Sequence, residues 1–186
     1  QRGLNHPEQS QLIDREIYDI DSNGYDVGMI KNDGTLWTWG RNTAGTLGAN
    51  SVQNLYSPVQ IGDHRWRKVV MGTHTGNQAT TALREDYTLW TWGHNTYGQL
   101  GITHGHTSWH TIHRSSPNQI TSGTGSFIHI ASNGQHSGAI DTQNRLYMWG
   151  INNYGQLGVG NILYRSSPTQ VTGSWSMVEV GYHHTY

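Results

Sequence analysis

The sequence predicts an all-β fold made of β-propeller blades. A motif of the form Leu-aromatic-x-Trp-Gly-x-Asn occurs three times in the 186 residues. Short strand-like segments bounded by Asn, Asp and Gly turns surround each copy, and no stretch has a convincing helical period. A unit of roughly 50 residues with several short antiparallel strands is typical of a propeller blade. Such a blade buries its apolar surface fully only beside a neighbour.

The three copies of the motif agree in spacing, at residues 35–48, 88–101 and 145–158. The period is 53 residues between the first two copies and 57 between the last two. A Ser-Pro strand follows each copy, and a short strand ending in a turn precedes it. We therefore expect three full blades and the start of a further one. Their expected bounds are about 15–62, 64–123, 126–173 and 174–186.

The conserved spacing assigns structural roles to the motif residues. The second aromatic residue of each copy recurs at one structural place, so these tryptophans are expected to be equivalent, largely buried and packed between adjacent sheets. The glycine after each of them, and the glycine that closes the next turn, are expected to take positive φ. The residues of this structural signature are Trp39, Gly40, Asn42, Gly48, Trp92, Gly93, Asn95, Gly101, Trp149, Gly150, Asn152 and Gly158.

Composition excludes several function classes. The formal net charge is -1 and charged residues make up 12% of the chain, so no basic stripe for nucleic acid is expected. The chain has no cysteine, which excludes disulfides and thiolate metal sites. No apolar run reaches the roughly 20 residues of a membrane span, so no membrane insertion is expected. Eight Trp and ten Tyr against one Phe favour rings with a flat buried body and a polar edge.

One insertion interrupts the regular pattern. Fifteen residues separate Gly101 from Pro117, whereas nine occupy the equivalent place in the other two copies. Two alternating histidines there could point the same way from a strand and bind a transition metal. We favour a solvated loop or an aromatic binding tip without metal, because no nearby carboxylate would orient the imidazoles. The insertion, residues 103–113, is expected to make a specific contact. Its histidines are His104, His106, His110 and His113, of which the first three are the candidate metal ligands.

No catalytic constellation is visible. The chain has no Gly-x-Ser-x-Gly elbow and no phosphate-binding loop before a helix, so we expect no enzyme activity and no cofactor. Acidic residues cluster near the start but lack the spacing of a calcium loop, and we interpret them as a solvated face. These residues are Asp14, Glu16, Asp19, Asp21 and Asp26.

The motif Leu-Trp-Thr-Trp-Gly-x-Asn-x-x-Gly-Gln-Leu-Gly, followed by Ser-Pro-x-Gln-Ile or Val, resembles the repeat of the regulator-of-chromosome-condensation family. The form here looks most like bacterial and bacteriophage members, although Thr46 replaces the glutamine of the other copies. The resemblance implies a seven-bladed propeller with four antiparallel strands per blade. Seven blades at this period need about 350 residues, so a partial propeller with parts of flanking blades is expected.

Two function classes remain open. Low charge and neutral polar or aromatic loops favour a non-enzymatic structural or binding module. We expect a bacteriophage tail, fibre or surface appendage, located at the virion or an extracellular surface, that acts in assembly or host attachment. Its partners would be protein subunits of the same assembly, or a host surface protein or glycan. The alternative is a cytoplasmic interaction scaffold or guanine-nucleotide exchange factor of the same repeat family.

Overall fold

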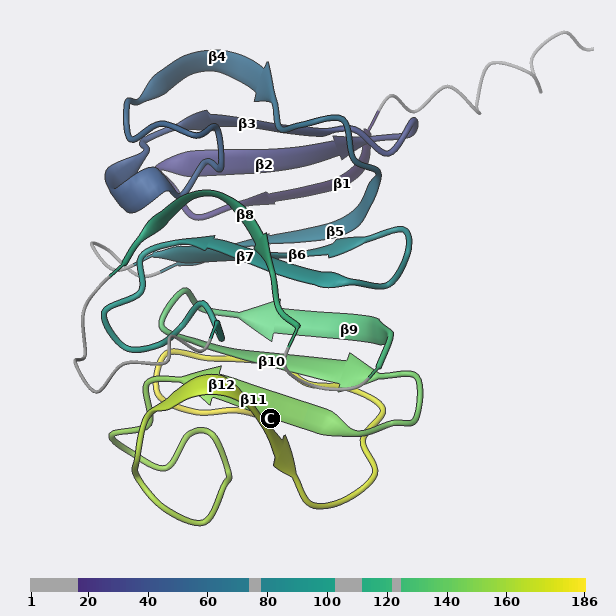
Figure 1. Ribbon diagram of the computed structural model, residues 1–186, viewed down its shortest axis with the longest axis vertical. Helices are drawn as coiled ribbons and strands as arrows, with labels where there is room; N and C mark the ends of the chain where they lie inside the picture. Colours follow the sequence, from purple (N-terminus) through teal and green to yellow (C-terminus); the bar gives the residue numbers. More distant parts are fainter. Residues whose placement is uncertain (1–16, 74–77, 103–111, 122–124) are drawn as a thin grey trace, which may run out of the picture.

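The computed structural model describes residues 17–73, 78–102, 112–121 and 125–186. Within them, three four-stranded antiparallel sheets lie one above another along the long axis (Figure 1). Strands in each sheet follow chain order. The first sheet contains β1 (Ile17–Ser22), β2 (Asp26–Lys31), β3 (Leu36–Gly40) and β4 (Leu55–Gln60). The second contains β5 (Trp66–Met71), β6 (Ala79–Arg84), β7 (Leu89–Gly93) and β8 (Arg114–Gln119). The third contains β9 (Phe127–Ser132), β10 (His136–Asp141), β11 (Leu146–Gly150) and β12 (Arg165–Val171).

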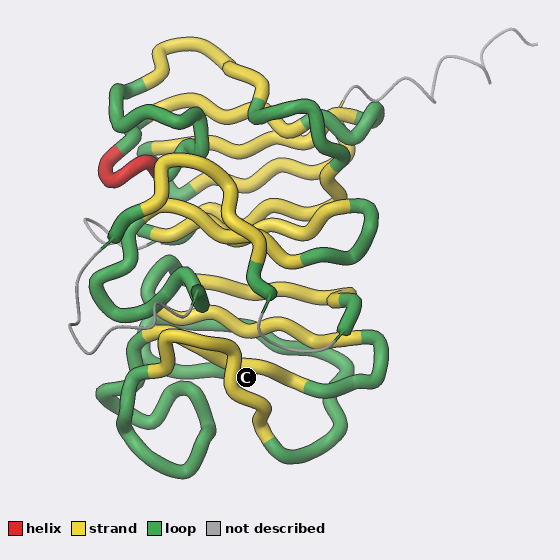
Figure 2. The backbone as a smooth tube through the Cα atoms, viewed as in Figure 1, coloured by secondary structure: helices red, strands yellow, loops and turns green. Residues whose placement is uncertain are grey.

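Strands and loops account for nearly all of the described backbone (Figure 2). The one helical element in the described part of the chain is η2 (Thr43–Gly45), a single 3-10 turn. The prediction of an all-β partial propeller is therefore confirmed. Among the same residues, no helix has the length and apolar character needed to cross a membrane.

The core lies between the sheets rather than within them. One buried cluster joins the first sheet to the second, and another joins the second to the third. A third cluster packs the last sheet against Val178 and its neighbours. In β2 buried and half-buried residues alternate, whereas β10 is buried along its whole length. The third sheet packs against the second sheet on one face and against Val178 and its neighbours on the other, so β10 is buried on both faces, whereas β2 has a described sheet on one face only.

Each of the two later motif tryptophans packs against the long loop of the sheet before it. The Trp92 Nε1 donates to the Thr46 carbonyl at 2.8 Å, and the Trp149 Nε1 donates to the Gln99 carbonyl at 2.9 Å. Both side chains are fully buried. Trp39 is only half-buried, so the expectation that it packs between sheets is wrong. The physical reason is that no described sheet precedes the first one.

The closing glycine of the motif touches the next tryptophan. Gly101 has φ +65, and a Cβ there would come within 3.0 Å of the Trp149 Nε1. A side chain at this position would therefore need both an unfavourable backbone conformation and space that the indole occupies. The other motif glycines also have the expected positive φ: Gly40, Gly48, Gly93, Gly150 and Gly158.

The acidic residues near the start are part of the sheet contacts. The Asp19 carboxylate accepts from the Lys68 Nζ at 2.9 Å, and Asp21 accepts from the Met71 backbone N–H at 2.7 Å. Asp26 is 1% exposed, and burial raises its pKa. The interpretation of these three residues as a solvated face is wrong, because they bind or face neighbouring elements. Asp14 and Glu16 lie outside the described residues.

Candidate interaction face

Loops leave the stacked sheets at two opposite edges. One edge, at the left of Figure 1, carries the turn between the first two strands of each sheet and the long loop between the last two. We call it the long-loop face; its described segments are 23–26, 40–55, 72–73, 93–102, 112–114, 133–136, 150–165 and 181–186. The opposite edge is the hairpin face, with described segments 31–35, 61–66, 84–88, 120–121, 125–127, 141–146 and 171–175.

The motif asparagines hold the long loops in shape. The Asn42 Oδ1 accepts from the Leu47 N–H at 2.9 Å, while its Nδ2 donates to two carbonyls nine and eleven residues later. Asn152 makes the same three bonds in the third sheet. Asn95 accepts from the Leu100 N–H at 3.1 Å. The hydrogen bonds of these asparagines therefore fix the backbone conformation of the loops that form the long-loop face.

Aromatic side chains cover much of the long-loop face. The Arg41 guanidinium lies over the Tyr25 ring at 5.4 Å. Tyr97 and Tyr164 meet edge to face at 5.7 Å and connect the long loops of the second and third sheets. Tyr154 contacts His183 at 4.6 Å and is 69% exposed. Tyr and Arg are enriched at protein interfaces because each combines large contact area with hydrogen-bonding groups.

Two histidines at the base of the insertion form a stacked pair. The rings of His94 and His113 lie 4.2 Å apart, and the His113 Nδ1 accepts from the Asn95 N–H at 3.1 Å. Burial, with a smaller contribution from His113, lowers the pKa of His94 to about 4. Burial also lowers the pKa of His113. The pair is therefore neutral at pH 7 and adds no positive charge to the face.

The other histidines proposed as metal ligands, His104, His106 and His110, lie outside the described residues. Within the described ranges, no group of three or more His, Asp or Glu side chains could hold a metal ion.

Charge is distributed unequally between the two faces. In the described segments, the long-loop face has one carboxylate side chain, the buried Asp26, and three arginines, Arg41, Arg114 and Arg165. The hairpin face has both signs in close pairs. Arginine–carboxylate distances there are 2.6 Å for Arg145–Asp141, 3.8 Å for Arg84–Asp86 and 4.0 Å for Arg65–Asp33. The overall charge of -1 conceals this asymmetry.

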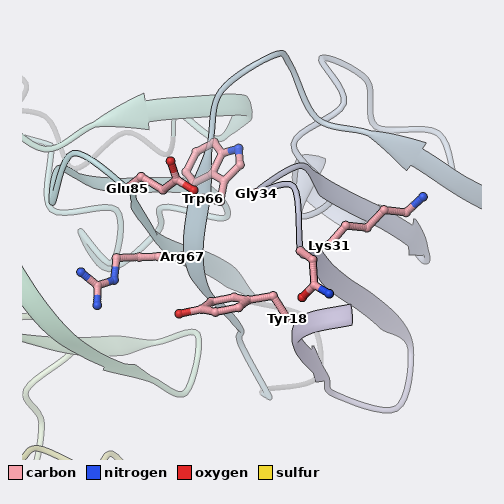
Figure 3. A pocket seen from close by; sticks show the side chains of 7 residues that line it. Tyr18, Lys31, Gly34, Trp66, Arg67 and Glu85 are labelled. Carbon is pink, nitrogen blue, oxygen red and sulfur yellow. The ribbon is translucent and has the colours of Figure 1, made fainter. Parts of the chain in front are cut away.

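A hollow of about 230 Å³ lies between the first two sheets near the hairpin face. Tyr18, Lys31, Trp66, Arg67 and Glu85 are among its lining residues (Figure 3). The Lys31 and Arg67 side chains extend in opposite directions rather than toward one point (Figure 3). Arg67 instead stacks on Tyr87 at 4.7 Å. The described residues of this hollow do not form a convergent set of acid, base and nucleophile.

The repeats match the family described as the regulator of chromosome condensation (RCC1) repeat, over residues 33–83, 88–140 and 143–186. Human probable E3 ubiquitin-protein ligase HERC4 is 35% identical over 79% of this chain, which spans 13% of that protein. The zebrafish protein RCC2 homolog is 33% identical over 70% of this chain, which spans 25% of it.

Solved structures show the same fold. Yeast RCC1 (Prp20), solved bound to Kap60, has a TM-score of 0.73 at 19% identity. The likeness covers 90% of this chain and 40% of that one. Human WBSCR16 has a TM-score of 0.71 at 19% identity, over 86% of this chain and 38% of the other.

These relatives correct one expectation. The expected location at a virion or extracellular surface is wrong, because the matching proteins come from human, rat, mouse, zebrafish and yeast and include ubiquitin ligases. The features that suggested a phage protein, low charge and neutral polar or aromatic loops, carry no information about the organism of origin. The matched segments cover most of the three sheets and all three motif copies. The chain therefore belongs to the RCC1 repeat family.

Proposed function

We propose that this chain is a protein-binding propeller segment that works in the cytoplasm or nucleus and holds its partner on the long-loop face. The observation that carries the proposal is the composition of that face: exposed tyrosines beside arginines, on loops fixed by buried asparagines. Rigid aromatic and arginine side chains bind protein surfaces at a low cost in conformational entropy.

The relatives support a binding role within eukaryotic cells. HERC4 and HERC2 are E3 ubiquitin-protein ligases, and this chain covers a small part of each. The study of yeast Prp20p describes its binding to Gsp1p and histones. We propose that the present chain contributes binding, and not catalysis, to whatever assembly contains it.

A site-specific photo-cross-linker tests the location of binding. It replaces Tyr154, which is 69% exposed on the long-loop face, or Tyr87, which is 40% exposed on the hairpin face. Cross-linking is done in eukaryotic cells, and each captured protein is then purified and its affinity for the full chain measured. We expect a specific partner from position 154 whose affinity falls in Tyr154→Ala and not in Tyr87→Ala.

Two outcomes would contradict the proposal. Equal capture from both positions, or capture from Tyr87 alone, would place binding elsewhere. A purified chain that accelerates guanine-nucleotide release from a small GTPase would show an exchange factor instead of a scaffold.

A further inference from the structure

We infer that the segment bound by the long-loop face is an acidic stretch of a partner protein. The inference rests on the proposed function and specifies the chemistry of the partner. The described segments of this face contain three arginines and no exposed carboxylate side chain; at the edge of the face lies the exposed Glu179, whose backbone is paired with that of Tyr186. Removing the water around an arginine in an interface costs free energy unless another hydrogen-bond acceptor replaces that water. A carboxylate is an acceptor that also neutralises the arginine's charge.

The arginine side chains are held in positions suited to this role. The Arg41 Nε donates to the Thr43 Oγ1 at 2.9 Å, and the guanidinium stacks on Tyr25. Its two terminal nitrogens have no hydrogen-bond acceptor among the described residues, and they form the fork that binds a carboxylate through two parallel bonds. The Arg165 Nη1 donates to the Leu163 and Tyr164 carbonyls at 3.3 Å, and its Nη2 donates to the Asn161 Oδ1 at 3.1 Å. Both terminal nitrogens are therefore bonded to its own loop, and Arg165 contributes mainly its positive charge to the face. Side chains fixed before binding lose less entropy when a partner arrives.

Arg165 and Arg114 occupy the same place in successive sheets. Arg165 pairs with Gly150 and Arg114 with Gly93, the glycines that follow the motif tryptophans. The two arginine positions therefore recur at one repeat spacing along the face. Tyr154, which is 69% exposed on the long loop of the third sheet, adds a hydroxyl group that can donate to a carboxylate.

The same charges do not favour nucleic acid. Duplex DNA carries one negative charge per roughly 1.7 Å, and proteins that bind it use a continuous basic stripe. Here the described face has no lysine, its stacked histidines are neutral at pH 7, and the whole chain has a net charge of -1. Three separated arginines fit an acidic peptide with spaced carboxylates better than a polyphosphate backbone.

Fluorescence anisotropy with labelled poly-L-glutamate tests the inference on the full chain at low salt, where charge pairing is least screened. The variant pair Arg41→Glu with Arg165→Glu reverses two charges on the long-loop face. Arg65→Glu is the matched control, because Arg65 is exposed on the hairpin face beside Asp33. We expect the double variant to weaken poly-L-glutamate binding by roughly tenfold or more, and the control to leave it unchanged.

Thermal unfolding checks that each variant is folded, and Arg41→Gln with Arg165→Gln replaces the reversal pair if it is not. The inference is overturned if poly-L-glutamate does not bind, if Arg65→Glu weakens binding equally, or if poly-L-lysine or duplex DNA binds more tightly. The inference is also overturned if a partner is cross-linked at Tyr154 and its affinity is unchanged by the substitutions at Arg41 and Arg165. The proposed function would then still hold. Failure to capture any partner at Tyr154 would instead count against the proposed function.

Discussion

Trp92 joins two sheets through one side chain. Its indole N–H is bonded to the Thr46 carbonyl of the first sheet, and its ring meets Trp66 edge to face at 5.8 Å. Trp39 occupies the same place in the motif and is only half-buried. The sequence therefore predicts the position of each tryptophan, but the energy that each contributes depends on whether a neighbouring sheet covers it.

We expect Trp92→Ala to lower the free energy of unfolding by about 3–5 kcal/mol, the cost of emptying a large buried aromatic site. Trp39→Ala should cost clearly less, since part of its surface is already in water. Urea unfolding of the two variants beside the parent chain measures the difference. A loss below about 1 kcal/mol for Trp92→Ala, or equal losses, would show that the contact between sheets is not the source of stability.

His136 makes stability depend on pH. Its side chain is fully buried at the start of β10, with Thr185 3.4 Å from the Nε2. Burial lowers the pKa of His136 to about 4; a hydrogen bond with the His184 backbone opposes this shift, and electrostatic interactions with the neighbouring His183 and His184 add to it. The unfolded chain, with an ordinary pKa near 6.5, takes up this proton more readily than the folded one. Stability is therefore complete above about pH 6.5 and decreases as the pH falls toward 4.

We expect the midpoint of thermal unfolding to fall between pH 7 and pH 5 in the parent chain and to fall less in His136→Gln. At roughly 1.4 kcal/mol per pKa unit, this side chain can contribute at most about 3.5 kcal/mol. His64→Gln, at an exposed histidine of the hairpin face that is not among the groups shifting the pKa of His136, is the control for replacing a histidine. Identical pH profiles for parent and His136→Gln would contradict this assignment.

At the scale of elements, the long loops show what the repeat encodes. Motif spacing predicts the strands, the glycines with positive φ and the asparagines that the loops need, because these features depend on local backbone geometry. It does not predict the stacking of His94 on His113, or the contact of Tyr97 with Tyr164, because each depends on residues brought together by the fold. The segregation of charge between the faces was missed for the same reason: pairing of the hairpin-face carboxylates appears only in three dimensions.

Gly98 and Gly155 allow the contact between sheets to be measured apart from backbone strain. Their φ values are +75 and +74, so an alanine meets the same conformational cost at both. A Cβ on Gly98 would come within 2.7 Å of the Ser166 Cα in the next sheet, whereas a Cβ on Gly155 has no described atom within 4 Å. We expect Gly98→Ala to destabilise the chain by about 1–3 kcal/mol more than Gly155→Ala in denaturant titrations. Equal destabilisation would mean that the two sheets separate at no cost.

On the scale of the whole molecule, the stack is close to one-dimensional. Each sheet contacts the sheets next to it, and the buried clusters lie at those contacts. A stack of this kind gains stability from each neighbour, so a sheet with two neighbours opens less often than a sheet with one. The long-loop face contains loops from all three sheets, so its shape depends on the sheets keeping their positions relative to one another.

Hydrogen exchange on the 186-residue chain tests this dependence. The strands β2, β6 and β10 are matched, because each is the second strand of its sheet and is paired on both sides. We expect amide protection at least roughly tenfold lower in β2 than in β6 and β10, because the first sheet is covered by described residues on one face only, whereas the third sheet packs against the second on one face and against Val178 and its neighbours on the other. Trp92→Ala should then raise exchange in β2 and β6 more than in β10, since it removes the contact between the first two sheets. Equal protection in all three strands, or a uniform response to Trp92→Ala, would show that the described sheets open as one cooperative unit instead of as neighbours in a stack.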